Sequence, residues 1–260
     1  MSDTRGTITA TVETRADGAR VAQITVDRQT KLNILDSRLC ADLRAAVDDV
    51  AADPEVRAIV LGGAGTRAFI GGADITEMVG LDTASAAAFI SGLHEVCAAL
   101  RAAPVPVIAR IQGHCLGAGL EVAASCDIRV CSDDAKFAMP EVRVGIPSVI
   151  EAALLPGLIG WGKTRELLFT GATFDAAEAL ACKLVEKVVP VAALDAAVET
   201  WLDGIIATGP KAIRAQKALI NQWQNLSLEE AIDAGIDAFA KAYESDEPRT
   251  MMRAFLERRR

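Results

Sequence analysis

The sequence predicts a single α/β domain that is followed by a helical segment. Up to about Val189, short apolar runs typical of strands alternate with longer runs whose apolar residues recur at helical spacing. No Ser/Gly-rich linker or low-complexity segment interrupts this alternation. From Ala192 onward the pattern indicates helices only. We therefore divide the chain into an α/β core, residues 1–191, and a C-terminal helical region, residues 192–260.

The first elements expected are a hairpin, a helix and a buried strand. Ile8 to Val26 alternates apolar and polar residues around Ala16-Asp17-Gly18, which is typical of a β-hairpin. Asp36 offers an N-cap to a helix that runs to about Val50, because apolar residues recur there on one side. The apolar run from Arg57 to Gly62 predicts a short buried strand.

The middle of the chain predicts two further helices with strands between them. A helix is expected over Ala84–Arg101, and a proline-rich turn ends it before the strand Val107–Ile111. A second helix, Gly117–Ser125, begins directly at a glycine turn. Strands at Ile128–Cys131 and near Phe137 follow it.

Length and composition indicate a globular protein. A chain of 260 residues can bury roughly 70 to 75 per cent of its unfolded surface, so a substantial core is expected. No uncharged apolar run reaches the roughly 18 to 20 residues that a bilayer requires. The start, Met1 to Arg5, lacks the basic and then apolar pattern of a secretory signal. We expect a cytoplasmic protein without a membrane partner.

Charge and cysteine usage narrow the partners further. Six cysteines are scattered without a CxxC pair in a chain with only two histidines, which is poor material for a zinc or iron site. We expect no bound metal, and free, mostly buried thiols as in a reducing compartment. The formal net charge of -8 opposes binding to a phosphate backbone, so no nucleic-acid partner is expected.

Two glycine-rich stretches and two glutamates carry the chemistry. The stretches are Ala68–Ile75 and Gly113–Glu121, and the pair Pro140-Glu141 follows twenty residues later. Glycine and alanine let the main chain approach a ligand and turn sharply, so peptide N–H groups can point at a developing negative charge. Glu121 and Glu141 would then handle protons. This equipment suits the stabilisation of an enolate while water is added to an activated acyl group, or while its double bond is moved.

These motifs, in this order and spacing, resemble the crotonase (enoyl-CoA hydratase/isomerase) family from Val26 to Phe255. The resemblance implies that the amides of Ala73 and Ala118 bind the thioester oxygen. Hydratases of the family use a Glu at each of two positions, here Glu121 and Glu141, whereas many isomerases keep only one. The resemblance also implies a spiral of ββα turns in two nearly perpendicular sheets, and a helical tail that forms a trimer or a dimer of trimers.

The resemblance further implies an acyl-CoA substrate and no cofactor besides the coenzyme A of that substrate. Positions that would bind the substrate or its coenzyme A include Lys31, Leu32, Gly72, Asp74, Ile75, Thr76 and Gly117. In family trimers a C-terminal segment places an aromatic and a cation near the coenzyme A of an adjacent subunit. Phe255 and Arg258 match that segment here, with Arg258 expected at the 3′-phosphate.

Each of these residues also has a purely structural interpretation. Glu121 would be an ion-paired or solvated residue early in a helix, and Glu141 an ordinary loop carboxylate. The glycines would be turn residues, Asp74 a helix cap, and Arg258 part of a frayed basic tail.

At the level of function, the alternatives are an enoyl-CoA isomerase or a hydrolase on a CoA thioester. An alternative of another class is a catalytically silent or RNA-binding protein.

Two other motifs are interpreted as decoys. Gly157 to Thr164 satisfies the P-loop pattern literally, but the run before it looks helical, whereas a P-loop should emerge from a buried strand. A helix-to-helix turn is expected there instead. Cys115, beside the glycine turn, is expected to be a packed thiol and not a nucleophile.

The chain departs from the family at two places. Many members carry a Gly-Gly pair after the segment that corresponds to Gly145–Pro147, but here Ser148–Ala152 follows, with a helix-like pattern and the extra carboxylate of Glu151. The acyl pocket is then narrower or more polar, or Glu151 faces solvent. Lys183 stands where a glycine commonly follows a helix, so that bend is either strained or different.

Overall fold

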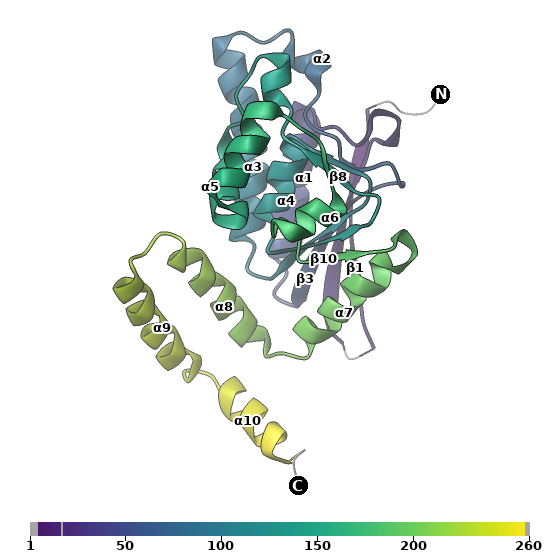
Figure 1. Ribbon diagram of the computed structural model, residues 1–260. Coiled ribbons are helices and arrows are strands. Elements are labelled where there is room, and N and C mark those ends of the chain that lie inside the picture. Colours follow the sequence, from purple (N-terminus) through teal and green to yellow (C-terminus); the bar gives the residue numbers. More distant parts are fainter. Residues whose placement is uncertain (1–4, 17, 258–260) are drawn as a thin grey trace.

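The computed structural model describes residues 5–16 and 18–257, and within them the chain forms two sheets (Figure 1). One sheet has six strands in the order β1-β2-β3-β5-β7-β10, and the other has four in the order β4-β6-β8-β9. In the larger sheet β1 and β2 pair antiparallel and the other neighbours pair parallel. In the smaller sheet only β8 and β9 pair antiparallel among the strands described.

The strands alternate between the two sheets. They are β1 (Thr7–Thr14), β2 (Arg20–Asp27), β3 (Val56–Gly63), β4 (Ala68–Ile70), β5 (Val107–Ile111), β6 (His114–Leu116), β7 (Ile128–Ser132), β8 (Lys136–Ala138), β9 (Phe174–Asp175) and β10 (Lys187–Val189). In the pairs β3–β4, β5–β6 and β7–β8, the first strand joins the larger sheet and the second joins the smaller one. A helical segment follows each pair, so the chain repeats a ββα unit, as expected.

Helices cover the sheets and form the tail. The α-helices are α1 (Ser37–Ala51), α2 (Ile75–Met78), α3 (Thr83–Ala102), α4 (Ala118–Ser125), α5 (Leu155–Thr170), α6 (Ala176–Ala181), α7 (Leu194–Ile206), α8 (Pro210–Trp223), α9 (Leu228–Ala242) and α10 (Glu247–Glu257). The 3-10 turns are η1 (Gln29–Lys31), η2 (Glu141–Val144), η3 (Ile150–Leu154) and η4 (Val191–Ala193).

The elements predicted from the sequence are confirmed. The hairpin pairs Thr7 with Asp27 and Thr14 with Arg20, and only Asp17 of its tip lies outside the described residues. Asp36 caps α1 by accepting a hydrogen bond from the Leu39 amide at 2.8 Å. The remaining predicted helices and strands are observed to within two residues at each end.

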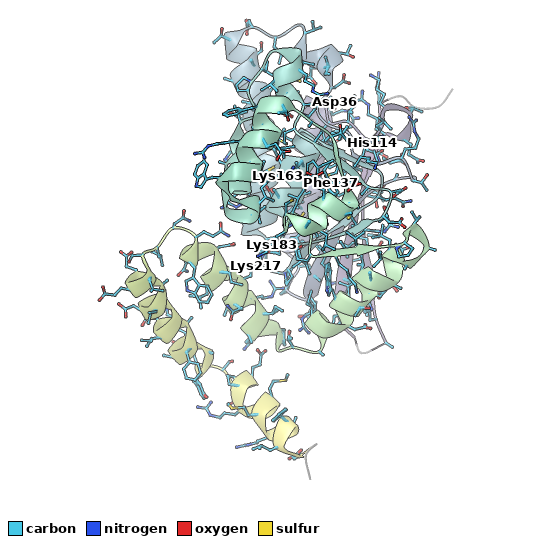
Figure 2. All side chains as sticks on the ribbon, in the orientation of Figure 1. Asp36, His114, Phe137, Lys163, Lys183 and Lys217 are labelled. Atoms are coloured by element: carbon cyan, nitrogen blue, oxygen red, sulfur yellow. The ribbon has the colours of Figure 1, made fainter. Side chains whose placement is uncertain are left out.

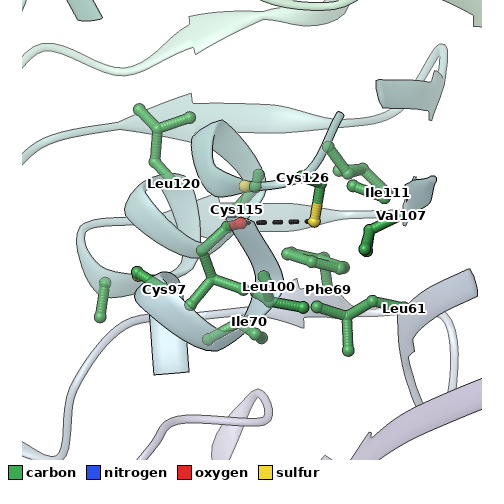
Figure 3. Close-up of a cluster of buried hydrophobic side chains, with 14 of the residues drawn as sticks. Leu61, Phe69, Ile70, Cys97, Leu100, Val107, Ile111, Cys115, Leu120 and Cys126 are labelled. Carbon is green, nitrogen blue, oxygen red and sulfur yellow. Dashed lines mark hydrogen bonds between the residues drawn. The ribbon is translucent and has the colours of Figure 1, made fainter. Parts of the chain in front are cut away.

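Two apolar clusters stabilise the core. The larger lies between the sheets and α1, α3 and α4, and Figure 3 shows part of it, with Phe69 and Ile70 of β4 against Leu100 of α3 and Leu120 of α4. The smaller cluster packs α7 against the other face of the larger sheet. Fully burying a large apolar side chain contributes about 1.5–3 kcal/mol, so these clusters hold the glycine turns of the chain in place.

Beyond α7, the tail leaves the body of the molecule. Helices α8, α9 and α10 extend away from the sheets, and α10 lies at the opposite end from α2 (Figure 1). One buried lysine anchors the tail: Lys217 on α8 (Figure 2) donates to the carbonyls of Leu100 and Val105 and contacts Asp127 at 2.8 Å. The helices after residue 192 therefore divide into α7, which packs on the larger sheet, and α8 to α10, which form the extension.

Among the described residues, α3 is the one helix long and apolar enough to cross a bilayer by length and composition alone. Its Phe89, Leu93, Val96, Cys97 and Leu100 are buried in the protein. This burial identifies α3 as a core helix.

Candidate active site

A cavity of about 140 Å³ lies where the two glycine-rich stretches meet the η2–η3 segment. Gly71, Gly72 and Ala73 line one side of it, and Gly117 and Ala118 line another. Glu121 and Glu141 supply the carboxyl groups of its wall. The structure thus brings together both predicted amides and both predicted carboxylates, which lie up to 68 positions apart in the sequence.

The backbone around Ala73 is held by a short parallel bridge to Leu35. The Leu35 amide donates to the Gly72 carbonyl at 2.9 Å, and the Asp74 amide donates to the Leu35 carbonyl at 2.8 Å. Gly72 has φ 123°, which lies in the region that side chains disfavour. Leu35 therefore holds the residue before Ala73 and the residue after it, and this fixes Ala73 at the cavity wall.

The second amide belongs to Ala118, the first residue of α4. N–H groups in the first turn of a helix have no acceptor within that helix, and the helix dipole adds positive potential there. Gly117, the N-cap, has φ 51°, and its amide donates to the Ala138 carbonyl at 2.9 Å. The turn therefore presents the Ala118 N–H to an oxygen in the cavity.

Glu121 is the fourth residue of α4 and is only 4% exposed. Its Oε1 accepts a hydrogen bond from the Ala152 amide of η3 at 3.3 Å. Burial, followed by the nearby charge of Glu141, raises the pKa of Glu121 from 4.5 to about 8, and Glu151 adds to the shift. In the free protein at neutral pH, this carboxyl group therefore carries a proton.

Glu141 begins η2 and faces Glu121 across the glycine turn. Its Oε2 accepts a hydrogen bond from the Ser148 hydroxyl at 2.7 Å. Its Oε1 lies so close to Gly117 that a Cβ atom at that position would overlap it. Only glycine at position 117 therefore allows Glu141 to lie against the N-terminus of α4.

The remaining cavity wall is apolar. Met78, Phe89, Ile90 and Leu93 line it from α2 and α3, and Val149 lines it from the segment after η2. Together with the two amides and two carboxyl groups, this wall leaves room for an apolar chain whose first carbons lie beside the proton-handling groups. Such an arrangement can polarise a carbonyl oxygen and move protons at the adjacent carbons.

The departure at Ser148–Ala152 is resolved in an unexpected way. Ile150 has φ 39°, so it keeps a left-handed, glycine-like backbone despite its branched side chain. Glu151 does not face solvent, and it does not line the cavity either. It is buried against α3, where His94 Nδ1 lies 2.9 Å from its Oε1. The expectation of a solvent-facing Glu151 is wrong, because the turn points this side chain into the protein.

The bend at Lys183 is strained but not different. Lys183 has φ 67°, and the Leu184 amide donates to the Ala179 carbonyl at 2.8 Å. This is the hydrogen-bond pattern in which helices usually end at a glycine.

Among the positions expected to bind the substrate or its coenzyme A, Gly72, Ile75 and Gly117 line the cavity, and Lys31, Leu32, Asp74 and Thr76 lie beside Gly72 and Ile75. Asp74 caps α2 by accepting from the Thr76 amide at 3.0 Å, as its structural interpretation predicts, and it pairs with Arg28 at 3.0 Å and with Lys31 at 3.4 Å. Burial alone would raise the pKa of Asp74, but the Thr76 donors and the charges of Lys31 and Arg28 lower it below its usual value. The Leu32 carbonyl accepts from the Gly71 amide at 2.8 Å. Ile75 is exposed beside the cavity.

Phe255 of the predicted C-terminal pair does not line this cavity within one chain. Phe255 is 56% exposed on α10, at the end of the molecule away from α2 (Figure 1). Arg258 lies outside the described residues. Any contact of Phe255 with a substrate in this cavity requires a second subunit.

The two decoys are confirmed as such. The P-loop-like stretch lies within α5, which is kinked at Gly160, and Lys163 pairs with Glu166 and Glu178. Cys115 is buried, its thiol donates to the Gly119 carbonyl at 3.3 Å, and burial raises its pKa well above the usual value. No group of three or more His, Cys, Asp or Glu side chains within residues 5–16 and 18–257 could hold a metal ion.

Sequence reasoning missed the residues that hold the carboxylates. The Ser148 hydroxyl and the Ala152 amide both come from Ser148–Ala152, a segment for which the sequence predicts bulk and a further carboxylate but no contact with Glu121 or Glu141. The apolar wall from Phe89 and Leu93 was also missed, although both lie in a predicted amphipathic helix. The sequence did carry one signal: the polar groups of Ser148–Ala152, which stand in place of the usual Gly-Gly pair, follow closely after Glu141. Polar groups next to a catalytic motif need hydrogen-bond partners, and the catalytic carboxyl groups are near.

Known proteins resemble this chain over almost its whole length. The family model for enoyl-CoA hydratase/isomerase matches residues 16–260. The chain is 34% identical to a short-chain-enoyl-CoA hydratase of Clostridium acetobutylicum and 33% identical to a crotonyl-CoA hydratase of Syntrophomonas wolfei, in each case over 93% of both chains. A crystal structure of an enoyl-CoA hydratase from Mycobacterium smegmatis matches with a TM-score of 0.91 at 30% identity, over 96% of this chain and 97% of that one. On its sequence, its ββα repeat and its site, the chain belongs to the enoyl-CoA hydratase/isomerase family.

Proposed function

We propose that the protein is an enoyl-CoA hydratase, which adds water across the 2,3 double bond of a trans-2-enoyl-CoA to give a 3-hydroxyacyl-CoA. The observation that carries this proposal is the pair Glu121 and Glu141 in one apolar cavity, beside the amides of Ala73 and Ala118. Relatives named as hydratases support it, since they match 93% of this chain. Family membership makes an acyl-CoA the expected substrate.

The reaction follows from these four groups. The two amides donate to the thioester oxygen, so that negative charge can develop there as water attacks C3. One carboxylate takes a proton from the attacking water, while the other carboxyl group gives its proton to C2. The pair therefore holds one proton before and after the reaction. Losing one oxyanion donor typically costs about 3–4 kcal/mol of barrier, and a general acid or base contributes about 100- to 10,000-fold.

Two assignments of the proton are possible. The family resemblance makes Glu121 the base for water and Glu141 the acid at C2. The raised pKa of Glu121 favours the reverse in the free protein, with Glu121 as the acid. Coupled groups titrate as a pair, so kinetics must decide. With the saturated analogue butyryl-CoA in D₂O, the residue that serves C2 is the one whose Gln variant loses C2 exchange, while the other Gln variant retains exchange and loses hydration only.

The cavity supports a short acyl chain. Its volume of about 140 Å³ compares with an engineered cavity of about 150 Å³ that holds a benzene molecule. About four to six carbons fill such a space. We expect kcat/KM to be greatest for C4 to C6 enoyl-CoAs and to fall for long chains.

We also propose that the protein assembles into a homotrimer or a dimer of trimers through its tail. Phe239 on α9 is 67% exposed, and the same helix exposes Leu228, Ile232 and Ile236. Exposed apolar surface of this extent is typical of an interface. Truncation after Thr250 should weaken the trimer in sedimentation and raise KM several-fold, because Phe255 and Arg258 would contact the coenzyme A of an adjacent subunit. Unchanged sedimentation and KM would contradict both roles.

The other partners proposed are few. The reaction needs no cofactor besides the coenzyme A of the substrate, since amides and carboxyl groups carry every step. A cytoplasmic location suits the six thiols, of which only Cys182 is partly exposed. The net charge of -8 argues against a nucleic-acid partner.

Mass spectrometry of paired substrates tests the function. A hydratase converts the 2-enoyl-CoA into a product heavier by one water and leaves the 3-enoyl-CoA unchanged. An isomerase converts the 3-enoyl into the 2-enoyl thioester, and a hydrolase releases free coenzyme A. Absence of any turnover, with tight binding of AU-rich RNA at physiological salt, would favour a silent or RNA-binding protein instead.

A further inference from the structure

A third carboxyl group lies behind the proposed catalytic pair. The side chain of Glu151 is 4% exposed, lies in η3 and does not line the cavity. Burying a carboxylate without partners is costly, so its contacts identify what it does.

Glu151 is held by α3. His94 Nδ1 lies 2.9 Å from its Oε1 and 3.2 Å from its Oε2, and Arg101 Nη1 lies 3.9 Å from Oε1. The His94 side chain is 51% exposed, so this contact connects the interior to the surface. Arg101 is fixed in turn by Gln224 after α8, at 3.2 Å.

The residues on either side of Glu151 connect it to the active site. Ile150 has φ 39°, a conformation that is strained for a β-branched residue and persists only where the surroundings enforce it. The Ala152 amide is shared between the Val149 carbonyl at 2.9 Å and Glu121 Oε1 at 3.3 Å. The strained turn therefore ends in the one hydrogen bond from η3 to Glu121 that the structure describes.

We propose that Glu151 is a positioning residue, which through its contact with His94 holds the Ile150–Leu154 turn so that the Ala152 amide orients Glu121. The pair acts through the backbone and does not touch the substrate. This proposal rests on the proposed hydratase function. It adds to that function a residue pair outside the cavity which sets the orientation of the carboxyl group inside it.

The charge of Glu151 also acts on Glu121, and it raises the pKa of that carboxyl group, whereas the hydrogen bond from the Ala152 amide lowers it. The groups that face Glu121 are Glu141 from η2, Glu151 from η3 and Cys97 from α3, and the two carboxylates raise its pKa, after burial, in that order. The groups that face Glu151 are His94, Arg101 and Cys97 of α3 and Glu121 of α4. Removing the charge of Glu151 should lower the pKa of Glu121, whereas a role in folding alone would leave it unchanged.

The test compares three variants with a matched control in steady-state hydration of crotonyl-CoA from pH 5 to 9. Glu151→Gln keeps an oxygen for His94 but removes the charge. Its kcat at the optimum should stay within about twofold, while the limb of the pH profile that reports Glu121 moves to lower pH. Glu151→Ala and His94→Ala release the turn, and kcat should fall about 10- to 100-fold with KM within about twofold. Glu95→Gln, at the next residue on α3, which pairs with Arg44 at the surface, should match the wild type.

Failures of the two proposals are distinguishable. A wild type that hydrates no enoyl-CoA contradicts the proposed function. An active wild type with an unshifted pH profile in Glu151→Gln and an unchanged kcat in His94→Ala contradicts the positioning role. Because Glu151→Ala removes a buried group and could fail to fold, the exposed His94 provides the second variant. Infrared titration of the Glu121 carboxyl band in the free protein, identified with Glu121→Gln, gives a readout without turnover and should move to lower pH in Glu151→Gln.

Discussion

Replacing Glu121 with glutamine should make the protein more stable at alkaline pH while abolishing its activity. The folded state raises the pKa of this carboxyl group from 4.5 to about 8, chiefly through burial. The folded protein therefore binds the proton more tightly than the unfolded chain, and stability is lost as pH rises from 4.5 through 8. Glutamine is a neutral isostere and escapes this loss.

The magnitude follows from the same linkage. Each pH unit inside that interval changes the free energy of unfolding by up to about 1.4 kcal/mol, so the full interval corresponds to an upper limit of about 5 kcal/mol. Relative to the wild type, Glu121→Gln should gain little at pH 5 and several kcal/mol at pH 9. Urea unfolding at a fixed protomer concentration measures the difference, with the exposed Glu55→Gln as the control. A stability difference that does not change with pH would refute the reasoning.

Three further substitutions test the geometry. Ser148→Ala removes the hydroxyl that donates to Glu141. Loss of this hydrogen bond, worth about 1 kcal/mol, should lower kcat roughly fivefold in the hydration assay. An unchanged kcat would show that the contact is dispensable. Gly117→Ala places a Cβ against the Glu141 carboxylate at a left-handed φ, so hydration should fall about 100-fold while circular dichroism stays native. Lys217→Ala removes the ion-pair partner of Asp127, whose carboxylate still accepts from the Val107 amide at 2.6 Å. The loss in denaturant unfolding should therefore be about 1.5–3 kcal/mol; a loss below about 1 kcal/mol would mean that the tail is anchored elsewhere.

Local signals in the sequence predict most of the fold. Asp36 and the apolar spacing after it define α1, and Gly117 marks the start of α4. Such signals act over a few residues, so they survive without knowledge of tertiary contacts. The two sheets required the family resemblance, because the alternation of strands between them involves pairing at long range.

The sequence predicted the catalytic groups of the candidate site but not the residues that hold them in position. Glu121 and Glu141 are found in one cavity, as their motifs imply. The burial of Glu151 could not be predicted, because it depends on His94, which lies 57 residues away. Ile150 shows the same limit, since a branched residue in a left-handed conformation contradicts local preference and is maintained by its surroundings.

The most direct test of the account is hydration of crotonyl-CoA by the wild type and by Glu121→Gln and Glu141→Gln, followed by loss of the enoyl-thioester absorbance. We predict measurable kcat/KM for the wild type and losses of about 100-fold or more in each variant, because each carboxyl group performs one proton transfer. KM should change little, since the amides of Ala73 and Ala118 still bind the thioester. Wild-type hydration in both variants would contradict the central claim that this pair performs the chemistry.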